Sequence, residues 1–387
     1  MTSDLSPATL LRELIRIPSV SSLSNRPMVE FAKNILAPRG WRIHELPYRD
    51  TNGNEKLNAI VTPPRQKAKD FSVDLAFVCH TDTVPYSPAW ADALEPTLRE
   101  GALHGCGACD VKGYLACLLA VLTSAPAEKF AHSVALVLTA EEEIGCIGTK
   151  NLLAANLLQA RHVLIGEPTS LYPARAGKGY NLAEIRVLGK EAHSAHPAQG
   201  VSAIFRAARF IEAIETLAGS LQHASQGETC LLFDPPYTTL NIGTIQGGTA
   251  KNIVPAECKF LLEWRSVPGE TGEMVIPAVL RIAEELQLND PEFSCEVEVL
   301  RQQAGFETAE DSPLLRRWVQ LSGRPPIGVS FGTEAPLMHA LTKDVVVVGP
   351  GDMRTAHSER ECVPIDELDQ GVSYLRALLM HPLLELR

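Results

Sequence analysis

Short apolar runs alternate with helical patterns along much of this chain. Runs over residues 73–79, 133–140 and 162–166 have the length and composition of buried strands, and each ends in a polar cluster. Helical patterns over 111–125 and 149–160 lie between these runs. Strands that alternate with helices in this way predict an α/β domain with a mostly parallel sheet flanked by helices.

The middle of the chain has a different pattern. Residues 181–189 alternate between apolar and polar side chains, as a half-exposed strand does, and 238–248 and 256–267 form a hairpin-like pair. Helical patterns over 201–217 and 272–287 accompany these strands. We expect an inserted α+β domain in which two helices pack on one face of an antiparallel sheet.

The α/β pattern returns in the last part of the chain. A helical pattern over 314–323 precedes an apolar run over 344–351, and a final helix starts near Asp366. We therefore expect residues 1–179 and 301–387 to form one domain, interrupted by the inserted domain over 180–300.

Charge and cysteine usage narrow the classes of function. The chain has 387 residues with 46 acidic and 35 basic side chains, so its formal net charge is −11. This charge argues against a sequence-independent nucleic-acid binder, which relies on neutralising phosphates. Nine scattered cysteines favour a reducing compartment, and neither a signal-peptide pattern nor a run of about 18 apolar residues occurs. We expect a soluble, cytoplasmic protein that does not bind membranes.

Residues with metal-binding chemistry follow the ends of the expected strands. These residues are two imidazoles and several carboxylates: His80, Asp110, Glu142, Glu143, Glu167 and His357. Open α/β sheets bind ligands at the carboxyl ends of their strands, because the loops diverge there. A mixed set of nitrogen and oxygen ligands suits Zn²⁺, Co²⁺ or Mn²⁺ better than Ca²⁺ or a thiolate-preferring metal.

The number of carboxylates favours two metal ions over one. Four acidic groups in one crevice would repel each other and become protonated, unless cations compensate their charge. Two divalent ions about 3.5–4 Å apart can share one carboxylate and one water molecule. Asp82, two residues after His80, is placed to accept the second ring N–H of that ligand.

Six segments, in this order, resemble the two-zinc amidohydrolase superfamily, which includes acetylornithine deacetylase, succinyl-diaminopimelate desuccinylase, aminoacylase and glutamate carboxypeptidase. The segments are HTDTVP (80–85), GCGACDVKG (105–113), TAEEEIGCIG (139–148), GEPTS (166–170), AHSAHPAQGVSAI (192–204) and FGTEAP (331–336). The resemblance covers nearly the whole chain. It implies that the interrupted domain is a metal-binding catalytic domain.

The resemblance also implies a role for each strand-end ligand. Asp110 would bridge two divalent ions, either Zn²⁺ or Co²⁺. His80 and Glu167 would bind one of these ions, and Glu143 and His357 would bind the other.

Other roles that the resemblance implies concern catalysis and the inserted domain. Glu142 would be the general base that activates a water molecule shared by the ions. The inserted domain would form a homodimer, in which His193 reaches the active site of the other subunit and holds the carbonyl oxygen. Asn252 and Arg265 match substrate-binding positions, with Arg265 gripping the α-carboxylate of an N-acyl amino acid.

Within the superfamily, three segments are most similar to the acetylornithine deacetylases. They are the segment after Glu167, the segment FGTEAP and the segment around His357. Backbone N–H groups at Gly332 and Thr333 could meet a substrate carboxylate. Glu334 could pair with the δ-ammonium of ornithine, because a desolvated cation needs an acidic partner.

The expected reaction is hydrolysis of N2-acetyl-L-ornithine to L-ornithine and acetate, a step of arginine biosynthesis. Deacetylation of acetylcitrulline, desuccinylation of succinyl-diaminopimelate and a broad aminoacylase activity are alternatives within the class. A binding protein that keeps the fold without catalysis is the alternative from a different class. The presence of Glu142 with every ligand argues against that binding protein.

Overall fold

The computed structural model describes residues 5–64, 71–224, 227–269 and 274–383. The chain divides into two compact units, which are described separately below. Unit 1 comprises Met1–Arg175, Thr308–Ile327 and Thr333–Arg387, and unit 2 comprises Ala176–Glu307 and Gly328–Gly332. The expected helix start at residue 272 lies outside the described residues, and the described part of that helix is α6 (Val275–Asn289).

Unit 1 contains most of a mixed sheet, whose residues 176–177, 306–307 and 328–329 fall within the bounds of unit 2. In the described residues this sheet has nine strands, in the order β1-β2-β6-β3-β7-β17-β8-β15, with β16 paired to β8. The strands are β1 (Arg42–Arg49), β2 (Glu55–Thr62), β3 (Phe71–His80), β6 (Val134–Thr139), β7 (Leu158–Ile165), β8 (Ala174–Gly177), β15 (Phe306–Glu307), β16 (Ile327–Val329) and β17 (Val345–Val347). The central pairs β3–β6, β3–β7 and β7–β17 are parallel, as the sequence predicts, and β1 and β2 add an antiparallel edge.

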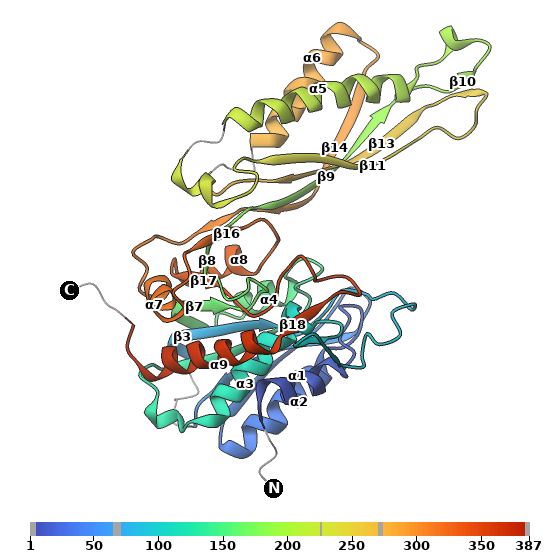
Figure 1. Ribbon diagram of the computed structural model, residues 1–387. Coiled ribbons are helices and arrows are strands. Elements are labelled where there is room, and N and C mark those ends of the chain that lie inside the picture. Colours follow the sequence, from blue (N-terminus) through green and yellow to red (C-terminus); the bar gives the residue numbers. More distant parts are fainter. Residues whose placement is uncertain (1–4, 65–70, 225–226, 270–273, 384–387) are drawn as a thin grey trace. The chain divides into compact units, whose positions relative to one another are not determined.

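Helices cover this sheet, as Figure 1 shows. The helices α1 (Pro7–Ile15), α2 (Arg26–Leu36), α3 (Gly113–Ser124) and α9 (Ile365–Met380) pack together. The helices α4 (Ile147–Ala154), α7 (Pro313–Ser322) and α8 (Ala335–Met338) complete unit 1. Residues 113–122 of α3 are all buried, which fits a helix that is apolar on every side.

The expected helix over 149–160 is shorter in the structure. It ends at Ala154, and β7 begins at Leu158. Asn156 has a left-handed φ of +50°, which terminates a helix, and Leu158, Gln159 and Ala160 alternate between buried and exposed positions, as a strand does.

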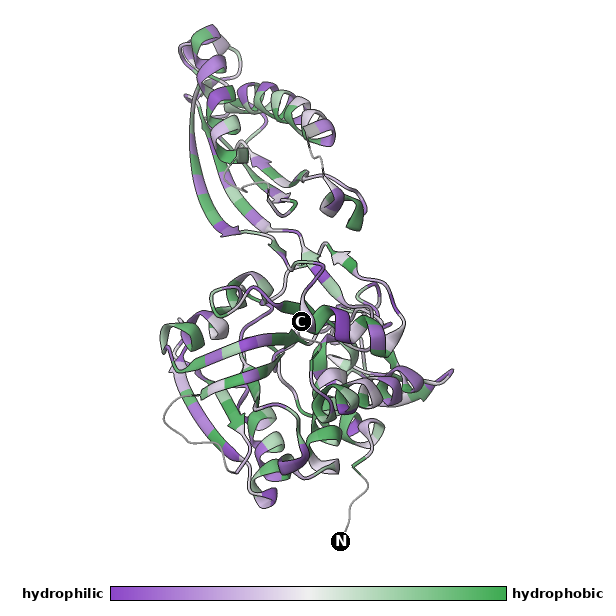
Figure 2. Cartoon of the chain, turned by 90° about the vertical axis from the view of Figure 1, so that its left-hand side faces the viewer, coloured by the Kyte–Doolittle hydropathy of each residue, from purple (hydrophilic) through white to green (hydrophobic). Residues whose placement is uncertain are grey.

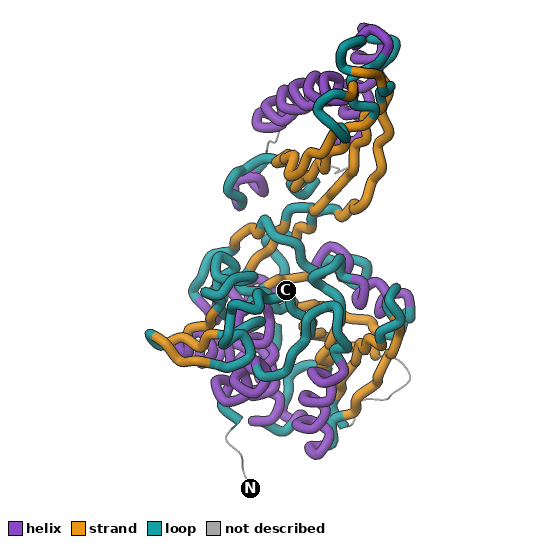
Figure 3. Tube along the Cα trace, turned by 90° about the vertical axis from the view of Figure 1, so that its right-hand side faces the viewer, coloured by secondary structure: helices purple, strands orange, loops and turns teal. Residues whose placement is uncertain are grey.

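Unit 2 contains an antiparallel sheet in the order β11-β13-β9-β14. Its strands are β9 (Tyr180–Leu188), β11 (Thr239–Gly247), β13 (Glu257–Arg265) and β14 (Ser294–Gln303). Alternate residues of β9 and β13 are buried, and the alternation of hydropathy along these strands can be followed in Figure 2. The buried residues pack against α5 (Ala203–Ala224) and α6, which lie on one side of the sheet in Figure 3. This is the expected α+β architecture.

Shorter elements complete the fold. The strands β4 (Thr97–Arg99), β5 (Ala102–His104) and β18 (Cys362–Pro364) form a small sheet in the order β18-β5-β4. In unit 2, β10 (Ala192–His193) pairs with β12 (Ile253–Val254). Short helical turns are η1 (Ala37–Arg39), η3 (Ala127–Lys129), η4 (Pro197–Gln199) and η5 (Glu228–Leu232). The segment η2 (Ala108–Lys112) is an irregular turn, because Asp110 and Val111 have non-helical φ and ψ. Every helix in the described part of the chain is too short or too polar to cross a bilayer.

Candidate metal centre

The parallel strands of unit 1 bring the expected ligands to one edge of the sheet. Among the described residues, two groups have ligand atoms that all lie within 4.8 Å of one another. The first group is His80, Asp110 and Glu167, and the second is Asp110, Glu143 and His357. His80 ends β3, and Asp110 lies in η2, before α3. The other three ligands each follow a strand: Glu143 follows β6, Glu167 follows β7 and His357 follows β17. All five expected ligands are therefore close together, and Asp110 belongs to both groups.

The two carboxylate oxygens of Asp110 face different histidines. Oδ1 lies 3.0 Å from Nε2 of His80, and Oδ2 lies 3.1 Å from Nε2 of His357. The same nitrogen of His357 lies 3.2 Å from Oε2 of Glu143. A carboxylate that directs one oxygen to each of two ligand groups has the arrangement of a bridging ligand.

The electrostatics of this edge favour bound cations. Burial raises the pKa of Glu142 to about 8 and, together with the charge of Asp110, also raises the pKa of Glu143 and Glu167. Hydrogen bonds with Asp110 and Glu143 raise the pKa of His357 to about 10. The acidic groups therefore resist ionising together, and the histidine takes up positive charge. Divalent ions would supply that positive charge instead.

Unpaired oxygens identify where ions would bind. Among the described residues, the buried Oε1 atoms of Glu143 and Glu167 have no hydrogen-bond partner. A buried carboxylate oxygen without a donor is costly, and metal coordination removes that cost. One such oxygen belongs to each ligand group, so the residues fit two ions.

Asp82 supports this site in a way that differs from the expectation. Nδ1 of His80 lies 3.1 Å from the backbone carbonyl of Asp82, whereas the carboxylate oxygen Oδ1 is 3.8 Å away. The carboxylate instead accepts the backbone N–H groups of Glu142 and Glu143, at 3.1 and 3.3 Å. It also accepts the hydroxyl of Ser21 at 2.7 Å. Asp82 therefore positions the glutamate pair, and its backbone carbonyl orients His80.

The neighbouring glutamates of the segment AEEE have different environments. Glu141 is 1% exposed, and its carboxylate accepts the Tyr48 hydroxyl at 2.8 Å and lies 3.7 Å from Nζ of Lys56. Glu142 is 9% exposed, and its Oε1 accepts the thiol of Cys146 at 3.2 Å. Glu141 is thus held by Tyr48 and Lys56, and Glu142 is the more exposed of the two carboxylates.

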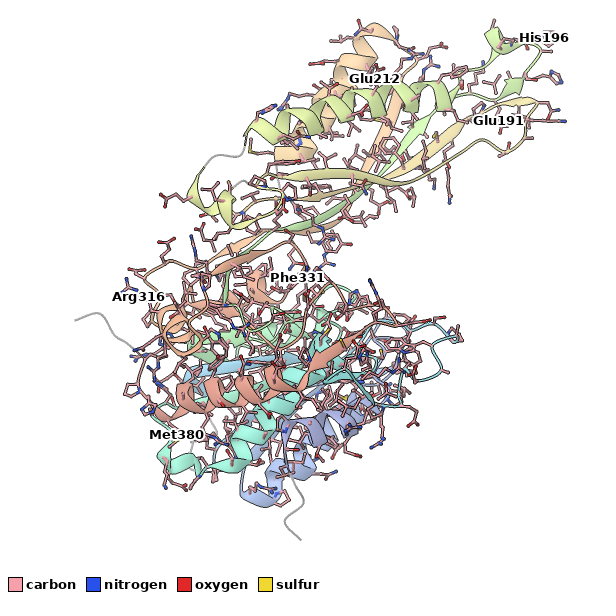
Figure 4. The ribbon with its side chains drawn as sticks, viewed as in Figure 1. Glu191, His196, Glu212, Arg316, Phe331 and Met380 are labelled. Atoms are coloured by element: carbon pink, nitrogen blue, oxygen red, sulfur yellow. The ribbon has the colours of Figure 1, made fainter. Side chains whose placement is uncertain are left out.

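Two residues expected to contact substrate lie at the β10–β12 pair of unit 2: His193 ends β10, and Asn252 directly precedes β12. His193 and Asn252 are both exposed, and the N–H of Ser194 donates to the carbonyl of Asn252 at 3.0 Å. His196, on the loop after β10, is labelled in Figure 4, and its ring lies 6.2 Å from that of His193. These residues are in unit 2, whereas the candidate ligands are in unit 1.

Arg265 forms part of a cationic cluster in unit 2 that the sequence did not reveal. Its guanidinium carbon lies 3.6 Å from the ring centroid of Tyr180, and that of Arg301 lies 4.1 Å from the same centroid. Glu263 accepts from Nε of Arg265 at 2.8 Å. A Cβ at Gly332 would lie 3.7 Å from the Tyr180 ring, so this expected substrate residue is near the cluster.

Thr333 and Glu334, the remaining expected substrate residues, are buried in unit 1. Glu334 is 0% exposed, its carboxylate accepts the hydroxyl of Thr149, and burial raises its pKa. In this structure Glu334 therefore has no accessible surface with which to meet a substrate ammonium, in contrast to the expected pairing. Glu334 directly precedes the short helix α8, and its side chain lies in the interior.

Comparison with known families identifies the fold and the chemistry. Residues 76–381 match peptidase family M20/M25/M40. The chain belongs to this family. It is 42% identical over 381 residues to acetylornithine deacetylase of Myxococcus xanthus, with 98% of each chain covered. It is 31% identical over 363 residues to acetylornithine deacetylase of Proteus mirabilis, with 92% of this chain and 91% of the relative covered.

Solved structures have the same fold as this M20-family chain. A tripeptidase from Staphylococcus aureus superposes with a TM-score of 0.77 and 23% identity, covering 98% of both chains. A metallo-carboxypeptidase from Sulfolobus solfataricus superposes with a TM-score of 0.74 and 17% identity, covering 97% of this chain and 98% of the other. The family and the full-length relatives identify the chain as a metal-dependent amidohydrolase.

We expect removal of divalent ions to destabilise unit 1 of this M20-family protein. Two ions present at about 100 times their dissociation constants would each stabilise the folded state by about 2.7 kcal/mol. Calorimetry should therefore show a lower Tm for the unfolding of unit 1 after EDTA treatment, with recovery after zinc is added back. A Tm that is the same in both states would contradict the fit of the ligand groups to ions.

Proposed function

We propose that this chain is an acetylornithine deacetylase, which hydrolyses N2-acetyl-L-ornithine to L-ornithine and acetate in arginine biosynthesis. Amide hydrolysis is supported by one arrangement above all: two ligand groups share Asp110, and Glu142 lies beside them. The choice of substrate is supported by the full-length relative of that name with 42% identity.

The ligand chemistry supports Zn²⁺ or Co²⁺ at both sites. His80 and Glu167 would hold one ion, Glu143 and His357 would hold the other, and Asp110 would be shared. When bound, such ions lower the pKa of a water molecule and polarise the carbonyl of the substrate amide.

Glu142 is assigned to the proton transfers. Its carboxylate accepts a proton from the attacking water and returns that proton to the amine nitrogen as the C–N bond breaks. The backbone of Glu142 is fixed by Asp82, and the side chain is held by Cys146, so the carboxylate has little freedom to turn away. The products are a carboxylate and a free amino acid.

Substrate contacts are assigned mainly to unit 2. Arg265 would bind the α-carboxylate with Asn252, and backbone N–H groups at Gly332 and Thr333 would support it. His193 of the partner subunit would hold the carbonyl oxygen as negative charge develops on it.

The protein would form a homodimer through unit 2, so that His193 of the partner subunit can take the role assigned above. Exposed apolar surface on α5 and β11 supports this proposal, because Phe205 is 71% exposed and Ile245 is 55% exposed. We also place the enzyme in the cytoplasm, because all nine cysteines lie in described ranges and form no disulfide there.

A kinetic panel tests the proposed substrate. The zinc- or cobalt-loaded enzyme is assayed with acetylornithine, acetylcitrulline, acetylmethionine and succinyl-diaminopimelate, and kcat/KM is compared. The highest value is expected for acetylornithine. A preference for acetylcitrulline or the succinylated substrate would replace this assignment with the corresponding activity, and binding without product release would establish a non-catalytic binding protein.

Replacement of Arg265 with methionine should weaken recognition of the carboxylate. The variant keeps an apolar stem against Tyr180 and removes a charge-assisted contact worth about 1.5–3 kcal/mol, so kcat/KM for acetylornithine should fall about 10- to 150-fold. The same variant should lose little activity on acetylornithinamide, which has no carboxylate. Arg301→Met, on the same ring, is the matched control. Equal losses on both substrates would contradict the assigned role of Arg265.

A further inference from the structure

Glu361 is a buried carboxylate with an unusual set of partners. It is 2% exposed and precedes β18, four residues after His357. Oε1 accepts the backbone N–H groups of Cys109 and Asp110, at 3.1 and 3.2 Å. Oε2 accepts the backbone N–H of Gly107 at 3.0 Å. One side chain therefore holds the whole turn that presents Asp110.

The backbone of Glu361 strengthens this connection. Its carbonyl accepts the N–H of Gly105 at 3.3 Å, and Cys362 pairs with His104 where β18 meets β5. On the other side, the N–H of Glu361 donates to the carbonyl of Ser358 at 2.9 Å, next to His357. Glu361 thus contacts the segments that supply two of the three ligands of the second group, Asp110 and His357.

The chemistry of these contacts requires a carboxylate. Three converging N–H groups need acceptors, and they would be left buried and unpaired without this side chain. A glutamine at this position has one acceptor oxygen and an NH₂ group that cannot accept. That NH₂ group would face at least one of the N–H donors.

We propose that Glu361 is a positioning residue, which holds the turn of Asp110 against the loop of His357 so that both ligands are set for metal binding. The inference rests on the proposed two-metal site. It goes beyond the ligand set, because Glu361 donates no atom to either ligand group. A merely structural role would affect folding stability and leave the metal affinity unchanged.

Glu361→Gln tests this role with three measurements, one of which uses no metal. Hydrogen exchange of metal-free protein reports on the amides of Gly107, Cys109 and Asp110. Competition with a chelator gives the affinity for Co²⁺, and the visible spectrum of bound Co²⁺ reports its geometry. Asp344→Asn is the matched control. Asp344 is a partly buried carboxylate that accepts the N–H of Leu314 and precedes β17, at the opposite end of that strand from the ligands.

We expect Glu361→Gln to increase exchange at the three amides at least about tenfold and to weaken Co²⁺ binding about 10- to 100-fold, the usual range for groups that orient ligands. The control should change neither quantity. Wild-type affinity and spectrum in Glu361→Gln would overturn the inference. Failure of the wild-type protein to bind two ions would instead overturn the proposed metal site.

A second variant covers the case in which Glu361→Gln does not fold. Glu361→Asp keeps the charge, but its shorter side chain cannot reach all three donors. It should bind Co²⁺ at least about threefold more weakly, with faster exchange at one or more of the three amides. Unchanged affinity in this folded variant would overturn the inference equally.

Discussion

Replacement of Glu142 with glutamine should lower kcat about 10²- to 10⁴-fold, the range for loss of a general acid–base group. The amide has nearly the same shape but cannot accept the proton of the attacking water. The metal content should stay at the wild-type level, because Glu142 belongs to neither ligand group. Steady-state kinetics and metal analysis of the same preparation provide the measurement.

Glu141→Gln is the matched control for this variant. Glu141 precedes Glu142 and is more deeply buried, but its carboxylate is engaged by Tyr48 and Lys56. We expect the Glu141→Gln variant to be less stable than the wild-type protein while keeping most of the wild-type kcat. If Glu142→Gln loses metal instead of kcat, the roles of Glu142 and Glu143 are exchanged.

Replacement of Asp110 with asparagine should disrupt both metal sites. Each carboxylate oxygen of Asp110 faces a different histidine, and asparagine has only one oxygen to offer. The amide also carries no charge to compensate a divalent ion. We expect the bound metal to fall from two ions to at most one, with the affinity of the lost site down by more than about 100-fold and activity abolished. Isothermal titration with zinc measures the stoichiometry.

Glu143→Gln separates a bridging ligand from a ligand of one site. This variant alters only the second group, so it should lose one ion and retain the other at near-wild-type affinity. Two ions bound by Asp110→Asn with unchanged affinities would show that Asp110 does not bridge them.

The ligand cluster could be predicted from the sequence because it depends on a local rule. His80 ends a strand and Glu167 follows one, and the carboxyl ends of parallel strands meet at one edge of a sheet. Buried parallel strands are also recognisable as short apolar runs, so the positions of these loops follow from the chain order. The clustering of the ligands therefore needed no knowledge of side-chain packing.

Other parts of the site depend on contacts between distant residues. Asp82 contacts the backbone of Glu142, and Glu361 contacts the turn at Cys109. Each contact joins two segments that are far apart in the sequence, so no periodic pattern predicts it. Similarly, Tyr180 meets Arg301 because their strands are neighbours in the sheet. A motif gives the type of residue at such positions, whereas packing decides its partner.

In the fold, too, features of single segments could be predicted, whereas features that depend on contacts between distant segments could not. The strands and helices of unit 2 were recognisable from alternation and helical spacing, which are properties of single segments. The end of α4 was misplaced, because the apolar residues after Ala154 suit a helix or a strand equally well. Pairing of β7 with β3 selects the strand, and that pairing is a property of the folded sheet.

Anomalous diffraction at the zinc edge, from crystals of zinc-loaded protein, tests the two-metal site most directly. The two-metal site predicts two peaks, one beside each carboxylate oxygen of Asp110. His80 and Glu167 should border the first peak, and Glu143 and His357 the second. A single peak at saturating zinc, or peaks bordered by other residues, would contradict it.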